Sequence, residues 1–248
     1  MAQKKPDGVK DTVKTVFYAI LIAILVRTVG YEPFNIPSGS MIPTLLIGDY
    51  LFVSKFSYGY SRYSLPFGLP LIPGRILFSE PERGDVVVFK LPSDNSSDYI
   101  KRIVGLPGDT IQVVGGVLQI NDKAVKREHI EDYRLRKSTG NFVSLTRYIE
   151  TLPNGKSHPI LETDGDNGFL DDWPRPHGYA KYHVPAGHYF AMGDNRDNSS
   201  DSRIFSTIPM QNLVGRAEFL FLSVDGAIWK FWQWPQSLRF ERMFTEIE

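Results

Sequence analysis

The stretch Pro37-Ser38-Gly39-Ser40-Met41-Ile42-Pro43-Thr44-Leu45 places two serines between two prolines, a few residues after the only long apolar run in the chain. Each proline fixes its own φ and restricts the residue before it, so the backbone is stiff at both ends. Gly39 lets the chain bend between the hydroxyls. The pattern predicts an exposed turn that presents hydroxyl and backbone N–H groups, as a nucleophile with an oxyanion hole requires. An ordinary loop rich in Ser, Gly and Pro has the same composition, and this stretch alone does not separate the two.

The composition sets limits on the class of protein. The chain has 248 residues, enough for one large domain or two small ones, and 42% of them are hydrophobic, enough for a real core. Its 28 basic and 28 acidic residues cancel, so it lacks the basic surplus of a nucleic-acid-binding protein. It has no cysteine, which excludes disulfides, thiol catalysis and thiolate metal sites.

The apolar run from Val13 to Val29 predicts a membrane anchor. Residues 15–26 carry no charge, and Lys14 and Arg27 can extend their charged ends to the interface, so the run approaches the ~20 residues that a span needs. The segment before it is rich in lysine, which by the positive-inside rule keeps the N-terminus in the cytoplasm. We therefore expect residues 1–31 to form a cytoplasmic tail and a single span, with the rest of the chain exported.

Two other interpretations of the apolar run stay open. A cleavable signal peptide has a similar length, although residues 28–33 lack the small-x-small site that cleavage requires. A buried helix of a soluble protein also needs only ~10–14 apolar residues.

The exported part predicts a mostly β fold, because alternating or β-branched runs are bounded by turn residues. Such runs occupy residues 50–54, 86–90, 99–106 and 213–224. Residues 56–75 show no period and predict a long surface loop. We expect an antiparallel β catalytic core, residues 32–109 and 187–248, and an inserted β-rich lobe, residues 110–186, with hairpin turns at Gly115-Gly116 and Asn121-Asp122.

Lys101 lies within the apolar strand pattern of residues 99–106. Most lysines on strands face solvent. The alternative is a lysine buried beside Ser40. Burial disfavours the ammonium form and lowers the pKa of the amine, so that it can accept the serine proton as a general base.

Other catalytic chemistry has little support in the sequence. The five histidines accompany no Gly-x-Ser-x-Gly elbow and no His-Glu-x-x-His motif. The acidic segment 164–168 has the wrong spacing for an EF-hand and is better interpreted as a plain turn. We expect neither a metal nor a cofactor. The polar loop 193–203 is either a solvated Asx-turn loop or a brace that sets a hydroxyl against Lys101 and supports the site with Asp–Arg pairs.

Four segments together resemble the bacterial type I signal peptidases, membrane-bound serine proteases that release exported proteins. The matching segments are EPFNIPSGSMIPTL (32–45) with GD (48–49), RGDVVVFK (83–90), YIKRIVGLPGD (99–109), and GDNRDNSSDSR (193–203) with LVGR (213–216). They follow the family's order and cover about half of the exported chain. Residues 110–186 match weakly.

The resemblance implies roles for single residues. Ser40 is the implied nucleophile and Lys101 the implied general base. Ser38 is the implied side-chain donor of the oxyanion hole, beside the Ser40 N–H, and Ser199 is implied to hydrogen-bond the lysine amine. Two implied structural ion pairs and a set of residues lining shallow pockets for small side chains complete the site: Asp201–Arg203 and Asp194–Arg102, and Phe34, Ile36, Met41, Leu45, Val88, Tyr99 and Ile100.

The implied substrate is a preprotein with an Ala-x-Ala-like cleavage site, and the implied location is the inner membrane with the catalytic domain on its periplasmic face. We expect a monomer that contacts the bilayer and no nucleic acid. Trp229, Phe231, Trp232 and Trp234 suit an interfacial surface, or packing against the core. Two further functions remain open: a self-cleaving Ser-Lys protease like the SOS repressors, and a membrane-tethered β binding module without a working site.

Overall fold

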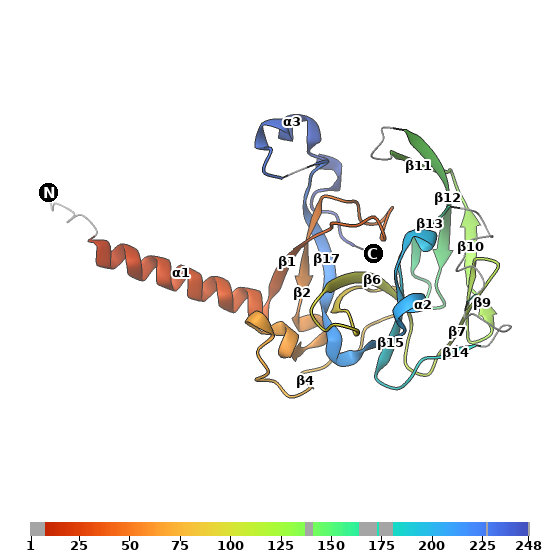
Figure 1. Ribbon diagram of the computed structural model, residues 1–248, viewed down its shortest axis with the longest axis horizontal. Coiled ribbons are helices and arrows are strands. Elements are labelled where there is room, and N and C mark those ends of the chain that lie inside the picture. The colour runs from red at the N-terminus through yellow and green to blue at the C-terminus, as the bar shows by residue number, and fades with distance from the viewer. Residues whose placement is uncertain (1–7, 137–140, 164–172, 174–180, 227, 248) are drawn as a thin grey trace.

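The computed structural model describes residues 8–136, 141–163, 173, 181–226 and 228–247. Its first element is α1 (Val9–Val29), which projects away from the rest of the protein (Figure 1). Asp11 in its first turn and Arg27 in its last turn complement the helix dipole. The helix is apolar and long enough to cross a membrane, and none of its residues is buried against the protein.

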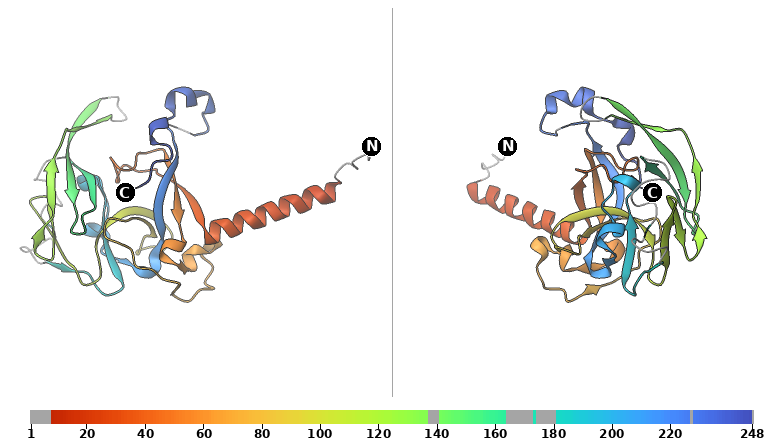
Figure 2. Two further views of the ribbon diagram at one scale, coloured as in Figure 1. Left: turned by 180° about the vertical axis from the view of Figure 1, so that it is seen from behind. Right: turned by 45° about the vertical axis from the view of Figure 1, so that its right-hand side comes forward.

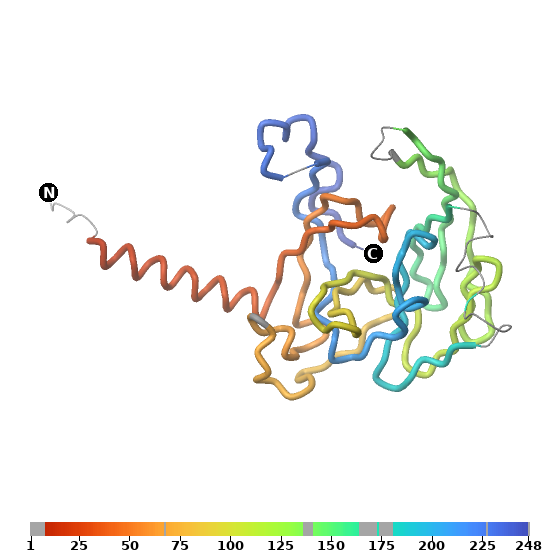
Figure 3. The backbone as a smooth tube through the Cα atoms, viewed as in Figure 1, coloured from red at the N-terminus to blue at the C-terminus, as the bar shows by residue number. Residues whose placement is uncertain are grey.

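A seven-stranded antiparallel sheet follows and forms the framework of the protein. Its strand order is β1-β2-β17-β5-β6-β15-β16. Strand β17, near the C-terminal end of the chain, therefore lies beside β2 and close to the strand that leaves the anchor (Figure 3). The strands are β1 (Tyr31–Asn35), β2 (Asp49–Ser54), β5 (Val86–Lys90), β6 (Asp98–Gly105), β15 (His188–Met192), β16 (Ile208–Pro209) and β17 (Leu213–Ser223).

The chain between β6 and β15 forms two smaller antiparallel sheets on the side opposite α1 (Figures 1 and 2). The two hairpin turns expected there have positive φ at both central residues, Gly115-Gly116 and Asn121-Asp122, as a two-residue hairpin loop prefers. One sheet contains β7 (Thr110–Val114), β8 (Val117–Ile120), β9 (Lys123–Ala124) and β14 (Tyr182–His183); the other contains β10 (Lys126–His129), β11 (Tyr133–Arg136), β12 (Phe142–Thr151) and β13 (Ser157–Glu162).

The mostly β fold class is confirmed. Helices after the anchor are short: α2 (Ser202–Phe205) and α3 (Trp234–Ser237) span one turn each. Residues 56–75 have more regular structure than expected, because β3 (Tyr60–Ser61) pairs with β4 (Arg75–Ile76) and 3₁₀ turns lie between them. The buried Tyr58 ties this segment to the sheet by donating a hydrogen bond to Asp85.

The hydrophobic core runs under the sheet and into the inserted strands. One cluster joins residues of β2, β5 and β17 with Ile36, Met41 and Leu45. Another joins Val104 and Phe190 of the large sheet to the apolar side chains of β7 and β8. The inserted strands are therefore packed directly on the sheet that carries residues 99–106.

Candidate active site

The Ser40 turn leaves the sheet after β1 and returns to it at β2. Its backbone is held by hydrogen bonds from Ile36 N–H to Asp49 O (2.8 Å) and from Leu45 N–H to Met41 O (2.9 Å). Ser38 is exposed on this turn, whereas Ser40 is buried, with 8% of its surface accessible. The turn is thus less exposed at Ser40 than the sequence indicates.

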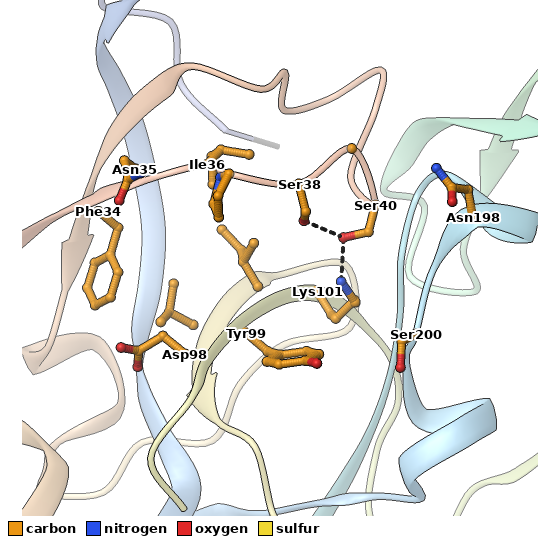
Figure 4. A pocket seen from close by; sticks show the side chains of 14 residues that line it. Phe34, Asn35, Ile36, Ser38, Ser40, Asp98, Tyr99, Lys101, Asn198 and Ser200 are labelled. Atoms are coloured by element: carbon orange, nitrogen blue, oxygen red, sulfur yellow. Dashed lines mark hydrogen bonds between the residues drawn. The ribbon is translucent and has the colours of Figure 1, made fainter. Parts of the chain in front are cut away.

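Lys101, on β6, reaches the same point from below the turn. Its Nζ lies 2.6 Å from Ser40 Oγ, and only 3% of the residue is exposed, so the solvent-facing alternative is wrong (Figure 4). Burial lowers the pKa of Lys101 to about 8, against an opposing effect of Asp201 and Asp194. A substantial fraction of the amine is therefore neutral near physiological pH.

Ser38 supplies a second hydroxyl to the site. Its Oγ lies 3.4 Å from Ser40 Oγ, and both point into the same cleft (Figure 4). A serine oxygen beside a second hydroxyl and a backbone N–H is an arrangement that can receive an oxyanion.

Ser199 departs from the role that the resemblance implies. It is buried, but among the described residues its hydroxyl has no hydrogen bond to the Lys101 amine. Its hydroxyl instead acts on the Asp201 carboxyl, whose pKa it helps to lower. Ser199 packs on Gly193, where its Oγ would lie 2.2 Å from a Cβ built on that glycine.

Both expected ion pairs are present next to the site. Arg102 binds Asp194 through Nε (2.9 Å) and Nη2 (2.8 Å), and Arg203 binds Asp201 through Nε (2.9 Å) and Nη2 (2.8 Å). Burial opposes the ionisation of both acids, but the arginine beside each holds the pKa of its carboxyl below the usual value. The Asp201 carboxylate also accepts a hydrogen bond from Gly193 N–H at 3.0 Å, which fixes the loop beside Ser40 and Lys101.

A cleft of about 540 Å³ opens at Ser40 and extends along β1 and β6 toward Phe34 (Figure 4). Five of the seven expected pocket residues line it: Phe34, Ile36, Val88, Tyr99 and Ile100. Met41 and Leu45 do not. Both are fully buried in the core, because the turn curls inward after Ser40 and directs these two side chains away from the cleft.

The site also contains residues that the sequence did not indicate: Asn35 and Asp98 line the cleft, and three more residues belong to the loop 193–203. Asn195 donates hydrogen bonds from Nδ2 to Gly39 O (2.9 Å) and from its backbone N–H to Ser40 O (3.1 Å). These two bonds tie the loop 193–203 to the serine turn. Asn198 and Ser200 line the cleft on the side of Ser40 away from Phe34 (Figure 4). The density of polar residues in this loop was the available signal. The segment 164–168, considered above for calcium, lies outside the described residues.

The family of the chain follows from its similarity to known proteins. The family model described as "Signal peptidase, peptidase S26" matches residues 9–222. The chain therefore belongs to the signal peptidase family, peptidase family S26, and it is a serine endopeptidase. Together with α1, this membership indicates a membrane-anchored protein.

The chain is similar to proteins named signal peptidase I in Rickettsia. It is 38% identical to that of Rickettsia typhi (strain ATCC VR-144 / Wilmington), over 98% of this chain and 96% of the relative. It is 39% identical to that of Rickettsia conorii (strain ATCC VR-613 / Malish 7), over 93% and 90%. A crystal structure of a signal peptidase I from Enterococcus faecalis V583 is 26% identical and covers 56% of this chain and 97% of its own, with a TM-score of 0.32.

Gly193→Ala tests how tightly the loop packs under the serine turn. The added methyl group would lie 2.5 Å from Ser40 O and 2.2 Å from Ser199 Oγ, so one or both must move. Because displacing a catalytic group by about 1 Å costs on the order of 100-fold in rate, we expect kcat/KM to fall by that order. Gly8→Ala, whose methyl group meets no atom within 4 Å, is the control. Unchanged kcat/KM in Gly193→Ala would contradict this packing.

Proposed function

We propose that this protein cleaves signal peptides from exported preproteins with Ser40 as the nucleophile and a neutral Lys101 as the general base. The observation that carries the proposal is the 2.6 Å separation of Lys101 Nζ and Ser40 Oγ at a buried position. The family relationship supports the reaction class, and the cleft that opens at Ser40 supports the kind of substrate.

The proposed reaction begins when the Lys101 amine accepts the Ser40 hydroxyl proton and Oγ attacks the scissile carbonyl carbon. The oxyanion that forms receives hydrogen bonds from Ser40 N–H and Ser38 Oγ–H. The Lys101 ammonium then protonates the leaving amine, and an ester remains on Ser40. Neutral Lys101 next takes a proton from water, which attacks the ester; the Ser40–acyl bond breaks, the signal peptide leaves as a carboxylic acid, and the Lys101 ammonium returns the proton to Ser40 Oγ.

The substrate would lie between two strand edges. Within the described residues β1 pairs only with β2, and the 98–101 part of β6 pairs only with β5. An extended peptide can therefore add as a strand along the cleft. Alternate side chains of a strand face the same way, so the residues at −1 and −3 enter the cleft together. Its apolar lining, from Ile36 and Ile100 to Phe34, favours small apolar side chains there.

The cleft also has a suitable position relative to the anchor. Its Phe34 end belongs to β1, which follows α1 after Gly30, so the signal helix of a substrate would approach from the lipid side. Trp229, Phe231 and Trp232 are 72%, 68% and 64% exposed and suit the headgroup region. We place the N-terminus in the cytoplasm and the catalytic core on the outer face, as a monomer, with residues 110–186 as an inserted lobe.

Ser40→Ala and Lys101→Ala test the dyad. Each variant removes one partner of the proton transfer, so we expect cleavage of a preprotein in detergent to fall to the uncatalysed background while the circular dichroism spectrum stays unchanged. Lys123→Ala, at an exposed lysine on β9, is the matched control and should retain activity. Cleavage by Ser40→Ala at a rate near that of the wild type would contradict the proposal.

The pH profile of kcat/KM tests the protonation state. The reactive form is the neutral amine, whose fraction falls as the pH drops below the pKa of about 8. Below that pH, kcat/KM should therefore decrease by about tenfold for each pH unit. A profile that stays flat between pH 8 and pH 5 would exclude Lys101 as the base.

A further inference from the structure

The inserted lobe meets the serine turn in two ways: Ile42 of the turn packs on Leu145 and Leu161 of the lobe, and residues 194–197 of the core lie between the lobe and Ser40. Leu161 N–H on β13 donates to Asp194 O at 2.8 Å, and Thr163 N–H donates to Asp197 Oδ2 at 2.7 Å. The segment 194–197 therefore lies along β13 and pairs with it at Leu161, although the two are far apart in the sequence (Figure 1).

A buried ion pair strengthens the same contact. Glu150 on β12 binds Arg196 with both carboxylate oxygens, at 3.0 Å to Nη1 and 2.5 Å to Nη2, and the two residues are 1% and 2% exposed. The two parallel bonds fix the orientation of the guanidinium as well as its position. Arg196 in turn immediately follows Asn195 in the chain.

The charges around this pair balance. Two other buried acids lie near it: Asp194, which Arg102 binds, and Glu162, which lies 3.4 Å from Arg127. His158 lies between the acids, with Nε2 3.4 Å from Glu150 and 3.9 Å from Asp194. Burial and the charge of Arg102 lower the pKa of His158 to about 4, so it is neutral at working pH. Loss of the Glu150 charge would leave the buried Arg196 without its hydrogen-bonded counter-ion, with only the more distant charges of Glu162 and Asp194 to compensate it.

We infer that Glu150 is a positioning residue for the nucleophile, and that the inserted lobe holds the Ser40 turn in place through Arg196 and Asn195. Asn195 transmits the constraint because it bonds both Gly39 O and Ser40 O. The inserted lobe thereby gains a part in catalysis without touching substrate. The inference rests on the function proposed above, in which Ser40 is the nucleophile.

Glu150→Gln is the test, because it keeps the shape of the side chain and removes its charge. A loosened serine turn should lower kcat by about tenfold, since rates are sensitive to small displacements of a catalytic group. KM should stay within about twofold, because the residues lining the cleft are untouched. The control is Glu128→Gln, which removes an exposed ion pair with Lys126 on the same lobe and should leave both constants unchanged.

The double variant Glu150→Gln/Arg196→Gln covers the case in which the single variant does not fold, because it removes both charges of the pair together. It should also fold and show the same loss in kcat at unchanged KM. Asn195→Ala, which removes the amide contact to Gly39 O, should reproduce this loss.

Two results would overturn the inference. One is a folded Glu150→Gln or double variant with wild-type kcat; the other is a fall in kcat/KM that comes only from a higher KM. Either result, together with an inactive Ser40→Ala, would refute the role of Glu150 and leave the proposed function intact. An active Ser40→Ala would refute the proposed function itself.

Discussion

A lysine amine that is almost fully removed from water sits against a serine hydroxyl, and the site depends on the cost of charging that amine. Hydration stabilises an ammonium ion, so burial shifts the equilibrium toward the neutral amine. With 3% of Lys101 exposed, the pKa falls from 10.5 to about 8. The mostly β framework makes this possible because β6 carries the lysine into the core beneath a stiff turn.

The neighbouring charges limit how far this shift goes. Asp201 and Asp194 raise the pKa of Lys101, which would favour its charged form if either acid stood alone. Each acid is paired with an arginine through two hydrogen bonds, and Arg203 lowers the pKa of the lysine. The paired acids therefore brace the loop under Ser40 and Lys101, and Arg203 offsets part of the stabilisation that they give to the ammonium form of Lys101.

Much of this architecture could be predicted from local sequence. The lysine-flanked apolar run predicted α1, the Gly-Gly and Asn-Asp pairs predicted two hairpins, and the serine turn between two prolines identified where a nucleophile could stand. Local sequence patterns failed where the tertiary fold decides the direction in which a side chain points. Met41 and Leu45 enter the core because the turn curls inward, and Ser199 faces Gly193. Nothing local to Glu150 indicates that it meets Arg196, since strand pairing far along the chain brings them together.

The most direct measurement is a titration of the Lys101 side chain itself, by NMR of its labelled ε-carbon in the folded protein in detergent. We expect a pKa of about 8 for Lys101 in the folded protein. The value should return toward 10.5 when the protein is unfolded, because burial is the cause of the shift. A value near 10.5 in the folded protein would show a charged lysine beside Ser40 and would contradict the account.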